Sequence, residues 1–244
     1  MIRFISVLFV LVILASCQDK SYNAQDILNT SIQRYGGENF QNATVRFKMR
    51  DLDYTMARKN GVPDFSVTRT LDTVSYKAIY KSGFQAYYID GVEQEETIFT
   101  RRFINSKLEG LLYLFSIPHV FNQNAVIAER LEDVIIRKQS YYTVHITFTK
   151  VEGEPENEFY LYIHPETFYV DFFTEKYDLT SKRVLFKKAI HTRVVDGFVF
   201  SDYKLFDDPT GTMELSEFYK GYNEATLNPL NDLIYTNITV ELNP

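Results

Sequence analysis

The feature that most constrains the fold is a two-residue alternation of apolar and polar side chains, which recurs over most of the chain. In residues 44–50, Val45, Phe47 and Met49 alternate with polar neighbours. Such alternation is typical of a β-strand with one buried and one solvated face. We expect further strands within 73–80, 84–99, 141–151, 159–167, 168–179, 182–206, 212–222 and 234–242. The sequence therefore predicts a mainly β (α+β) protein.

Two turn signals indicate that neighbouring strands pair in an antiparallel manner. Asp90-Gly91 and Asp196-Gly197 each interrupt an alternating segment, and both residue types tolerate the positive φ angles of a tight hairpin turn. Aromatic residues make up 16% of the chain, which is typical of a sheet-rich domain. The pattern predicts roughly ten to twelve strands in an antiparallel sheet that curls into a barrel or a sandwich.

Two segments depart from the alternation and predict helices. Residues 25–35 place Ile27, Leu28, Ile32 and Tyr35 at helical spacing before Gly36-Gly37. Residues 107–117 are so densely apolar that both faces of a helix would be buried, and that helix would end near Pro118. We expect it to pack against the concave face of the sheet, either as plain core or as the lining of a ligand site.

The N-terminus has the organisation of a secretory signal that ends in a lipid attachment site. Residues 1–16 combine Arg3 with an apolar run too short to span a bilayer, which needs about 20 residues. The sequence before Cys17, the only cysteine, resembles the lipobox of bacterial lipoproteins. We expect lipidation at Cys17, a polar stalk over 17–24 and a single domain over 25–244. Because Gln18 and not Asp follows the cysteine, we expect anchoring in the outer membrane of the cell envelope.

Charge and motif content exclude several classes of function. A net charge of −6 without a basic tract argues against nucleic acid. Nucleophile-elbow, P-loop and dinucleotide motifs are missing from the sequence, so we expect no enzyme and no cofactor. We also expect no metal site, because the glutamates at 152, 154, 156 and 158 indicate a solvated hairpin tip and the histidines lack ligand spacing. Those histidines are His119, His145, His164 and His191, of which His145 and His191 are candidates to meet across a sheet.

Several elements together resemble a known family. These are the lipobox, the opening helix ending "RYGG", the strand "ATVRFKMRDLDYTM", the apolar segment ending "LFSIPHVF" and the hairpin beginning "YYTVHITF". The chain resembles DUF6503-type lipoproteins of Bacteroidetes, which are similar to the LolA/LolB superfamily of lipoprotein-sorting carriers. The resemblance implies an incomplete antiparallel β-barrel of about 11 strands, closed by helices over an apolar cavity for acyl chains.

Two hypotheses for function follow from these observations. The first is a lipid-anchored envelope protein that binds a hydrophobic ligand, a lipid or a lipoprotein acyl chain, between the sheet and the helix at 107–117. Its lining would comprise Leu111, Leu112, Leu114, Phe115, Ile117 and Phe121, with His119 as a polar group at the rim. The alternative is a module with a self-filled core that binds an envelope protein partner through its outer face.

Overall fold

The computed structural model describes residues 22–81, 84–95, 97–98, 115–149, 157–176 and 184–243. The helical elements in this part of the chain are α1 (Ala24–Arg34), η1 (Gly37–Asn42), η2 (His119–Phe121), η3 (Leu215–Glu217) and α3 (Phe218–Glu224). The strands are β1 (Ala43–Met49), β2 (Leu52–Lys59), β3 (Val62–Leu71), β4 (Val74–Lys81), β5 (Phe84–Ile89), β6 (Val92–Glu93), β7 (Val126–Ile136), β8 (Gln139–Phe148), β9 (Glu158–Ile163), β10 (Val170–Lys176), β11 (Val184–Val195), β12 (Phe198–Asp207), β13 (Asn228–Pro229) and β14 (Thr236–Leu242).

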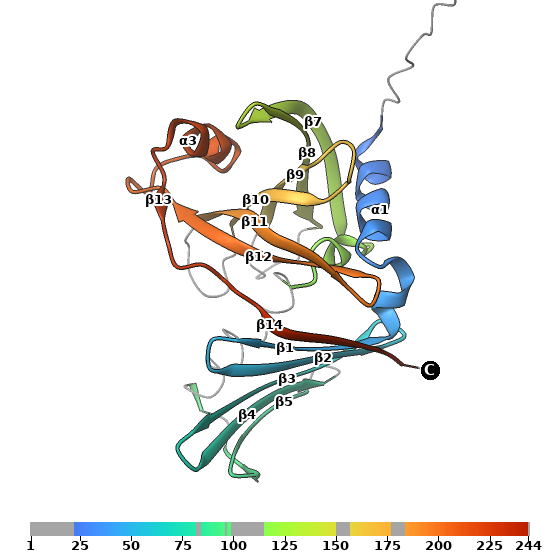
Figure 1. The fold of residues 1–244 in the computed structure, drawn as a ribbon, viewed down its shortest axis with the longest axis vertical. Helices are drawn as coiled ribbons and strands as arrows, with labels where there is room; N and C mark the ends of the chain where they lie inside the picture. The colour runs from blue at the N-terminus through green and yellow to red at the C-terminus, as the bar shows by residue number, and fades with distance from the viewer. Residues whose placement is uncertain are drawn as a thin grey trace, which may run out of the picture.

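Within the described residues, the strands form two open antiparallel sheets of seven strands each (Figure 1). The first sheet, sheet A, has the order β14-β1-β2-β3-β4-β5-β6, and the second, sheet B, has the order β13-β12-β11-β10-β9-β8-β7. Almost every strand therefore pairs with its neighbour in sequence, as the hairpin signals predict. The prediction of a mainly β protein with an open, curved antiparallel arrangement is confirmed, and the structure adds the division into two sheets.

The C-terminal segment joins the two sheets. The short strand β13 pairs with β12 in sheet B, and further along Leu233 exchanges two backbone hydrogen bonds with Tyr203 of β12. The chain then leaves sheet B and continues as β14, which pairs with β1 in sheet A, where Thr44 lies opposite Glu241. Residues 228–242 hydrogen-bond first to sheet B and then to sheet A, so the two sheets meet along this segment, which we call the seam (Figure 1).

Helix α1 packs beside sheet B, as Figure 1 shows. The Asn23 side chain accepts the backbone N–H of Asp26 and caps the helix. Ile27, Leu28 and other apolar side chains of the helix are buried in the core with residues of β8 and β9, which confirms the helix predicted at 25–35. Gly36 follows the helix at φ +115°, and a Cβ there would lie 2.5 Å from a ring carbon of Phe198. The close approach of these two segments therefore requires glycine.

The main core fills the space between the two sheets. Its largest fully buried members come from both sides, for example Met56 and Phe65 of sheet A and Phe159 and Phe173 of sheet B. A second, smaller core lies on the other face of sheet B under α3, and it consists of Ile136, Tyr141, Tyr162, Phe172, Phe186, Phe218, Tyr222 and Leu227. The central strands β9 and β10 of sheet B are therefore buried on both faces.

The predicted hairpin turns are confirmed, since Asp90, Gly91, Asp196 and Gly197 all have positive φ angles. The strand predicted at 212–222 is wrong, because residues 215–224 form η3 and α3. Phe218 and Tyr222 are four residues apart, which brings both rings to one helix face against the smaller core.

The helix predicted at 107–117 lies outside the described residues except for its last three positions. Phe115, Ser116 and Ile117 form turns and not a helix, and η2 follows directly after Pro118. A residue that precedes proline is disfavoured in the α-helical region, so helical geometry is not expected immediately before Pro118. For these three residues the predicted helix is wrong.

Candidate functional site

The residues predicted to line a ligand site divide into two groups. Leu111, Leu112 and Leu114 lie outside the described residues, and so does the predicted lipidation site Cys17. Phe115, Ile117, His119 and Phe121 belong to residues 115–121, which we call the inter-sheet segment because its side chains are buried in the main core between the sheets. The structure therefore brings together the four described candidates.

Phe115 bridges the two sheets through ring contacts. Its ring stacks on Phe47 of β1, with 3.9 Å between the centroids, and lies 5.1 Å from the ring of Phe200 on β12. The ring of Tyr235, in the seam, meets Phe115 edge-on at 5.0 Å. A gap of about 10 Å³ remains beside Phe115 and Ile117, which is enough for one water molecule. At this point, the inter-sheet space is filled by the protein's own side chains.

The backbone of the inter-sheet segment is not part of either sheet. The N–H groups of Val120, Phe121 and Asn122 donate to the carbonyls of Ser116, Pro118 and His119, respectively. These hydrogen bonds all close within the segment and the residue that follows it. The side chains of Ser116 and His119 provide hydrogen bonds to the surrounding structure, from Arg58 and to Tyr35. Within the part of the chain that the structure describes, the segment is therefore held by side-chain packing and side-chain hydrogen bonds and not by a strand ladder.

His119 is a buried residue, with 6% of its surface exposed. Its ring stacks on Phe40 of η1, with 3.9 Å between centroids and 6° between ring planes. Nε2 lies 3.1 Å from the carbonyl oxygen of Tyr35, so Nε2 carries the proton and donates it. Burial lowers the pKa of His119 to about 4. Nδ1 is then a buried acceptor, and no side chain or backbone group in the described residues partners it.

Arg58 is a second buried polar group in the same layer, and the sequence analysis did not single it out. It occupies the inward face of β2 after Leu52, Tyr54 and Met56, and 7% of its surface is exposed. The alternation along β2 could have revealed Arg58 in the sequence, because it places position 58 on the same face as the buried positions 52, 54 and 56. Burial lowers the pKa of this guanidinium to about 10.

The Arg58 guanidinium lies between two aromatic rings. Its Cζ is 4.3 Å from the ring centroid of Phe40 and 5.1 Å from that of Phe65. Nη2 donates a 2.7 Å hydrogen bond to Oγ of Ser116 in the inter-sheet segment. No aspartate or glutamate in the described ranges forms an ion pair with Arg58. Because Arg58 and His119 both lie over the Phe40 ring at about van der Waals distance, they cover its opposite faces.

A different buried charge is paired within the protein. Lys187 of β11, which is 1% exposed, forms an ion pair with the buried Glu175 of β10 on the side of sheet B that carries Phe173 of the main core. Burial lowers the pKa of Lys187, and the adjacent Glu175 carboxylate acts in the opposite direction. This pair satisfies its own charges, so it calls for no external ligand.

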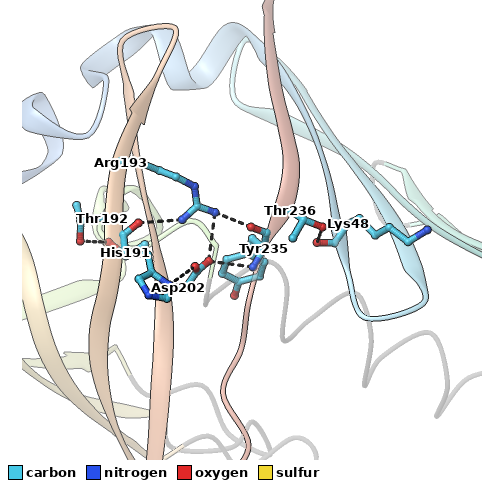
Figure 2. Close-up of polar contacts among 8 residues, drawn as sticks. Lys48, His191, Thr192, Arg193, Asp202, Tyr235 and Thr236 are labelled. Carbon is cyan, nitrogen blue, oxygen red and sulfur yellow. Dashed lines mark hydrogen bonds and ion pairs between the residues drawn. The ribbon is translucent and has the colours of Figure 1, made fainter.

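A polar joint holds the seam between the sheets (Figure 2). Oδ1 of the buried Asp202 on β12 accepts the backbone N–H of Tyr235 at 2.9 Å and Nη2 of Arg193 at 3.2 Å. The same Arg193 nitrogen also donates to the Tyr235 carbonyl at 2.6 Å, and Nδ1 of His191 lies 3.1 Å from the other Asp202 oxygen. These contacts fix the C-terminal segment where it crosses from sheet B to sheet A. We assign the joint a structural role.

The remaining histidines do not form a common site. His145 lies on β8 and His191 on β11, with β9 and β10 between them, so the two do not meet across the sheet. Nε2 of His145 instead contacts Oε1 of Glu158 at 2.8 Å. Across the ranges that the structure covers, no group of three or more His, Cys, Asp and Glu side chains could hold a metal ion. The same ranges contain no helix long and apolar enough to cross a membrane.

Two open antiparallel sheets around an aromatic interior define the class: a mainly β protein with a curved, unclosed sheet arrangement and few helices. A family model described as "Family of unknown function (DUF6503)" matches residues 3–233, and the chain belongs to this family. The sequence-based identification of DUF6503 is therefore confirmed.

Two further comparisons complete the findings. The crystal structure of a DUF1329 family protein from Desulfovibrio piger ATCC 29098 is similar at a TM-score of 0.43 and 5% identity, over 88% of this chain and 92% of that one. A likeness at this level transfers no property from one protein to the other. A comparison with curated proteins finds no significant match.

Proposed function

We propose that this protein is a lipid-anchored component of the bacterial cell envelope that binds a hydrophobic ligand, a lipid or a lipoprotein acyl chain, in the space between its two sheets. The observation that carries the proposal is the way the inter-sheet segment is held. The backbone–backbone hydrogen bonds that the segment makes among the described residues close within residues 116–122, so moving it breaks none of the described strand ladders. A ligand chain can therefore replace its apolar contacts while both sheets stay intact.

Binding of such a ligand requires only that its apolar surface is buried, and it involves no chemical reaction. Each ligand CH₂ transferred from water contributes about 0.8 kcal/mol, so an acyl chain can replace the contacts that Phe115, Ile117 and Phe121 make in the core. The aromatic surfaces of Phe47 and Phe200 would remain as walls on either side. The proposed site includes all the predicted lining residues, among them Leu111, Leu112 and Leu114, which lie outside the described residues.

The test is native mass spectrometry of the protein purified from its own cells, followed by titration with a fluorescent fatty acid. We expect a bound lipid mass and saturable uptake. Leu112→Asp should abolish uptake, whereas the same change at the exposed Ile135 of β7 should leave it intact, with circular dichroism confirming that both variants fold. Equal uptake by Leu112→Asp would refute the site assignment. A protein that carries no lipid and takes up none would refute ligand binding.

The anchor is tested separately. A signal peptide over 1–16 and acylation at Cys17 predict that cells fed radiolabelled palmitate will label the wild-type chain and that Cys17→Ala will not be labelled. Fractionation should then place the wild-type protein with the outer membrane. Label on the Cys17→Ala variant would contradict the proposed attachment site.

A second function is favoured by one specific observation. The gap beside Phe115 measures only about 10 Å³, so the core at this point is already filled. A permanently filled core would fit a non-enzymatic module that binds an envelope protein through its outer face. The same titration separates the two functions, because such a module would take up no fatty acid.

A further inference from the structure

Buried cations in proteins are normally paired with an acid, whereas Arg58 has no acidic partner among the residues that the structure describes. Its guanidinium has five N–H donors, and one of them has a hydrogen-bond partner among the described residues, the Ser116 hydroxyl. The guanidinium carbon lies 4.3 Å from the ring centroid of Phe40 and 5.1 Å from that of Phe65, and neither ring offers a hydrogen-bond acceptor of the strength of a carboxylate. The protein therefore buries guanidinium N–H donors that have no described partner, next to the inter-sheet segment.

A second, independent group at the same place is also unsatisfied. Nδ1 of His119 is a buried acceptor without a partner in the described residues, and His119 covers the opposite face of the Phe40 ring. In contrast, the Lys187–Glu175 pair elsewhere in the core meets its own charge requirement. Buried hydroxyls such as those of Ser31 and Thr143 also lack a described partner. Around Phe40, however, an unpartnered imidazole nitrogen lies over the same ring as an arginine that has no acidic partner among the described residues.

The hydrogen bond between Arg58 and Ser116 connects the unpartnered guanidinium donors to ligand binding. Ser116 belongs to the inter-sheet segment, so displacing that segment removes the only described hydrogen-bond partner of the Arg58 guanidinium. A neutral chain entering the space would leave a buried guanidinium with no acceptor, which is unfavourable. An anionic oxygen that took the place of the Ser116 hydroxyl would instead form a charge-assisted hydrogen bond, or two parallel ones if it belonged to a planar carboxylate.

We propose that Arg58 binds the anionic head group, a carboxylate or a phosphate, of the hydrophobic ligand. This inference rests on the proposed function, because the ligand chain must occupy the space that the inter-sheet segment fills. The cost of removing Arg58 from water is already incurred when the protein folds, so the head group meets a desolvated, pre-oriented cation. We therefore expect the protein to bind a chain with an anionic head group more tightly than a neutral chain of the same length.

The experiment compares three probes with the same chain length: palmitate, palmitoyl lysophosphatidate and hexadecanol. Their affinities are measured by displacement of a fluorescent fatty acid from the full chain at neutral pH. We expect at least one anionic probe to bind about tenfold to a hundredfold more tightly than hexadecanol, the range that a hydrogen bond to a charged group supplies. Preference for palmitate or for lysophosphatidate identifies the head group as carboxylate or phosphate.

Two variants test whether Arg58 is responsible. Arg58→Gln should remove the preference while leaving hexadecanol affinity unchanged, and Arg58→Lys should restore part of it. Arg46→Gln is the matched control, because Arg46 lies exposed on β1 and pairs with Glu241 at 3.1 Å. Circular dichroism checks the fold of each variant. If Arg58→Gln does not fold, the comparison of probes on the wild-type protein still decides whether an anionic end is preferred, and Arg58→Lys then tests the residue, because an unchanged preference in that variant would overturn the role of the Arg58 guanidinium.

The outcomes separate this inference from the proposed function. Equal affinity for all three probes overturns the anionic head group and leaves hydrophobic binding standing. A preference that survives Arg58→Gln assigns the selectivity to another residue and overturns the role of Arg58. Failure of all three probes to bind overturns both proposals, since no ligand then enters the inter-sheet space.

Discussion

Acidification should destabilise the folded protein through a single buried residue, His119. Its pKa is lowered to about 4, from an ordinary value of 6.5, first because the ring is buried and also because Arg58 is close; the hydrogen bond to the Tyr35 carbonyl opposes this. Above pH 6.5, His119 is neutral in both the folded and the unfolded state. Between pH 6.5 and 4, the unfolded chain binds a proton that the folded protein does not, so stability falls as pH falls.

The magnitude follows from the interval between the two pKa values. A tenfold change in proton affinity corresponds to about 1.4 kcal/mol, so the shift from 6.5 to about 4 removes about 3 kcal/mol from the free energy of unfolding. The loss is absent above pH 6.5 and complete near pH 4. For a protein of ordinary stability, 3 kcal/mol is a large part of the total.

The assay is urea unfolding at pH 7, 6, 5 and 4, followed by circular dichroism, for the wild type and for His119→Phe. Phenylalanine can retain the stack on Phe40 but cannot take up a proton. The difference in unfolding free energy between the two proteins should change by about 3 kcal/mol in favour of the variant as the pH is lowered. Parallel pH dependences in the two proteins would refute the argument that His119 is buried in its neutral form.

Two further predictions concern buried charges with a structural role. Asp202→Ala removes the acceptor of the Tyr235 N–H and one of the acceptors of Arg193, which keeps the His191 and Tyr235 carbonyls, so we expect a loss of about 1–3 kcal/mol in chemical denaturation; an unchanged free energy of unfolding would contradict the importance of the joint. Lys187→Met alone should cost about 3–5 kcal/mol, because it leaves the buried Glu175 carboxylate without its partner, whereas the double variant that combines Lys187→Met with Glu175→Leu should recover most of that loss. Additive effects in this double-mutant cycle would show that the two residues are not coupled.

Local features of the sequence were sufficient for most elements. Alternation predicted strands that become β1, β4, β8 and β14, and the Asp-Gly pairs predicted two hairpin turns with positive φ angles. The strand predicted at 212–222 was wrong, since Phe218 and Tyr222 follow helical spacing but the segment is short enough to suit either period. Short apolar runs are ambiguous in this way, because two or three side chains fit both patterns.

The candidate site was predictable only in part. Apolar density in the sequence marked residues 115–121, which the structure places in the main core. Arg58 was not predicted, because an arginine at the end of an alternating strand usually reaches solvent. Its burial depends on Phe40 from η1 and Phe65 from β3, and neither contact can be inferred from the residues next to Arg58 in the sequence.

By itself, the sequence determined where many of the strands and two hairpin turns form, because side-chain periodicity and the φ preferences of Asp and Gly act between near neighbours. Only the tertiary structure decided that the strands divide into two sheets, that the chain end returns to pair with β1, and that Arg58 and His119 enclose the Phe40 ring. These features depend on contacts between residues far apart in the chain. Their free energy comes from burying surfaces against each other, a quantity that no local pattern specifies.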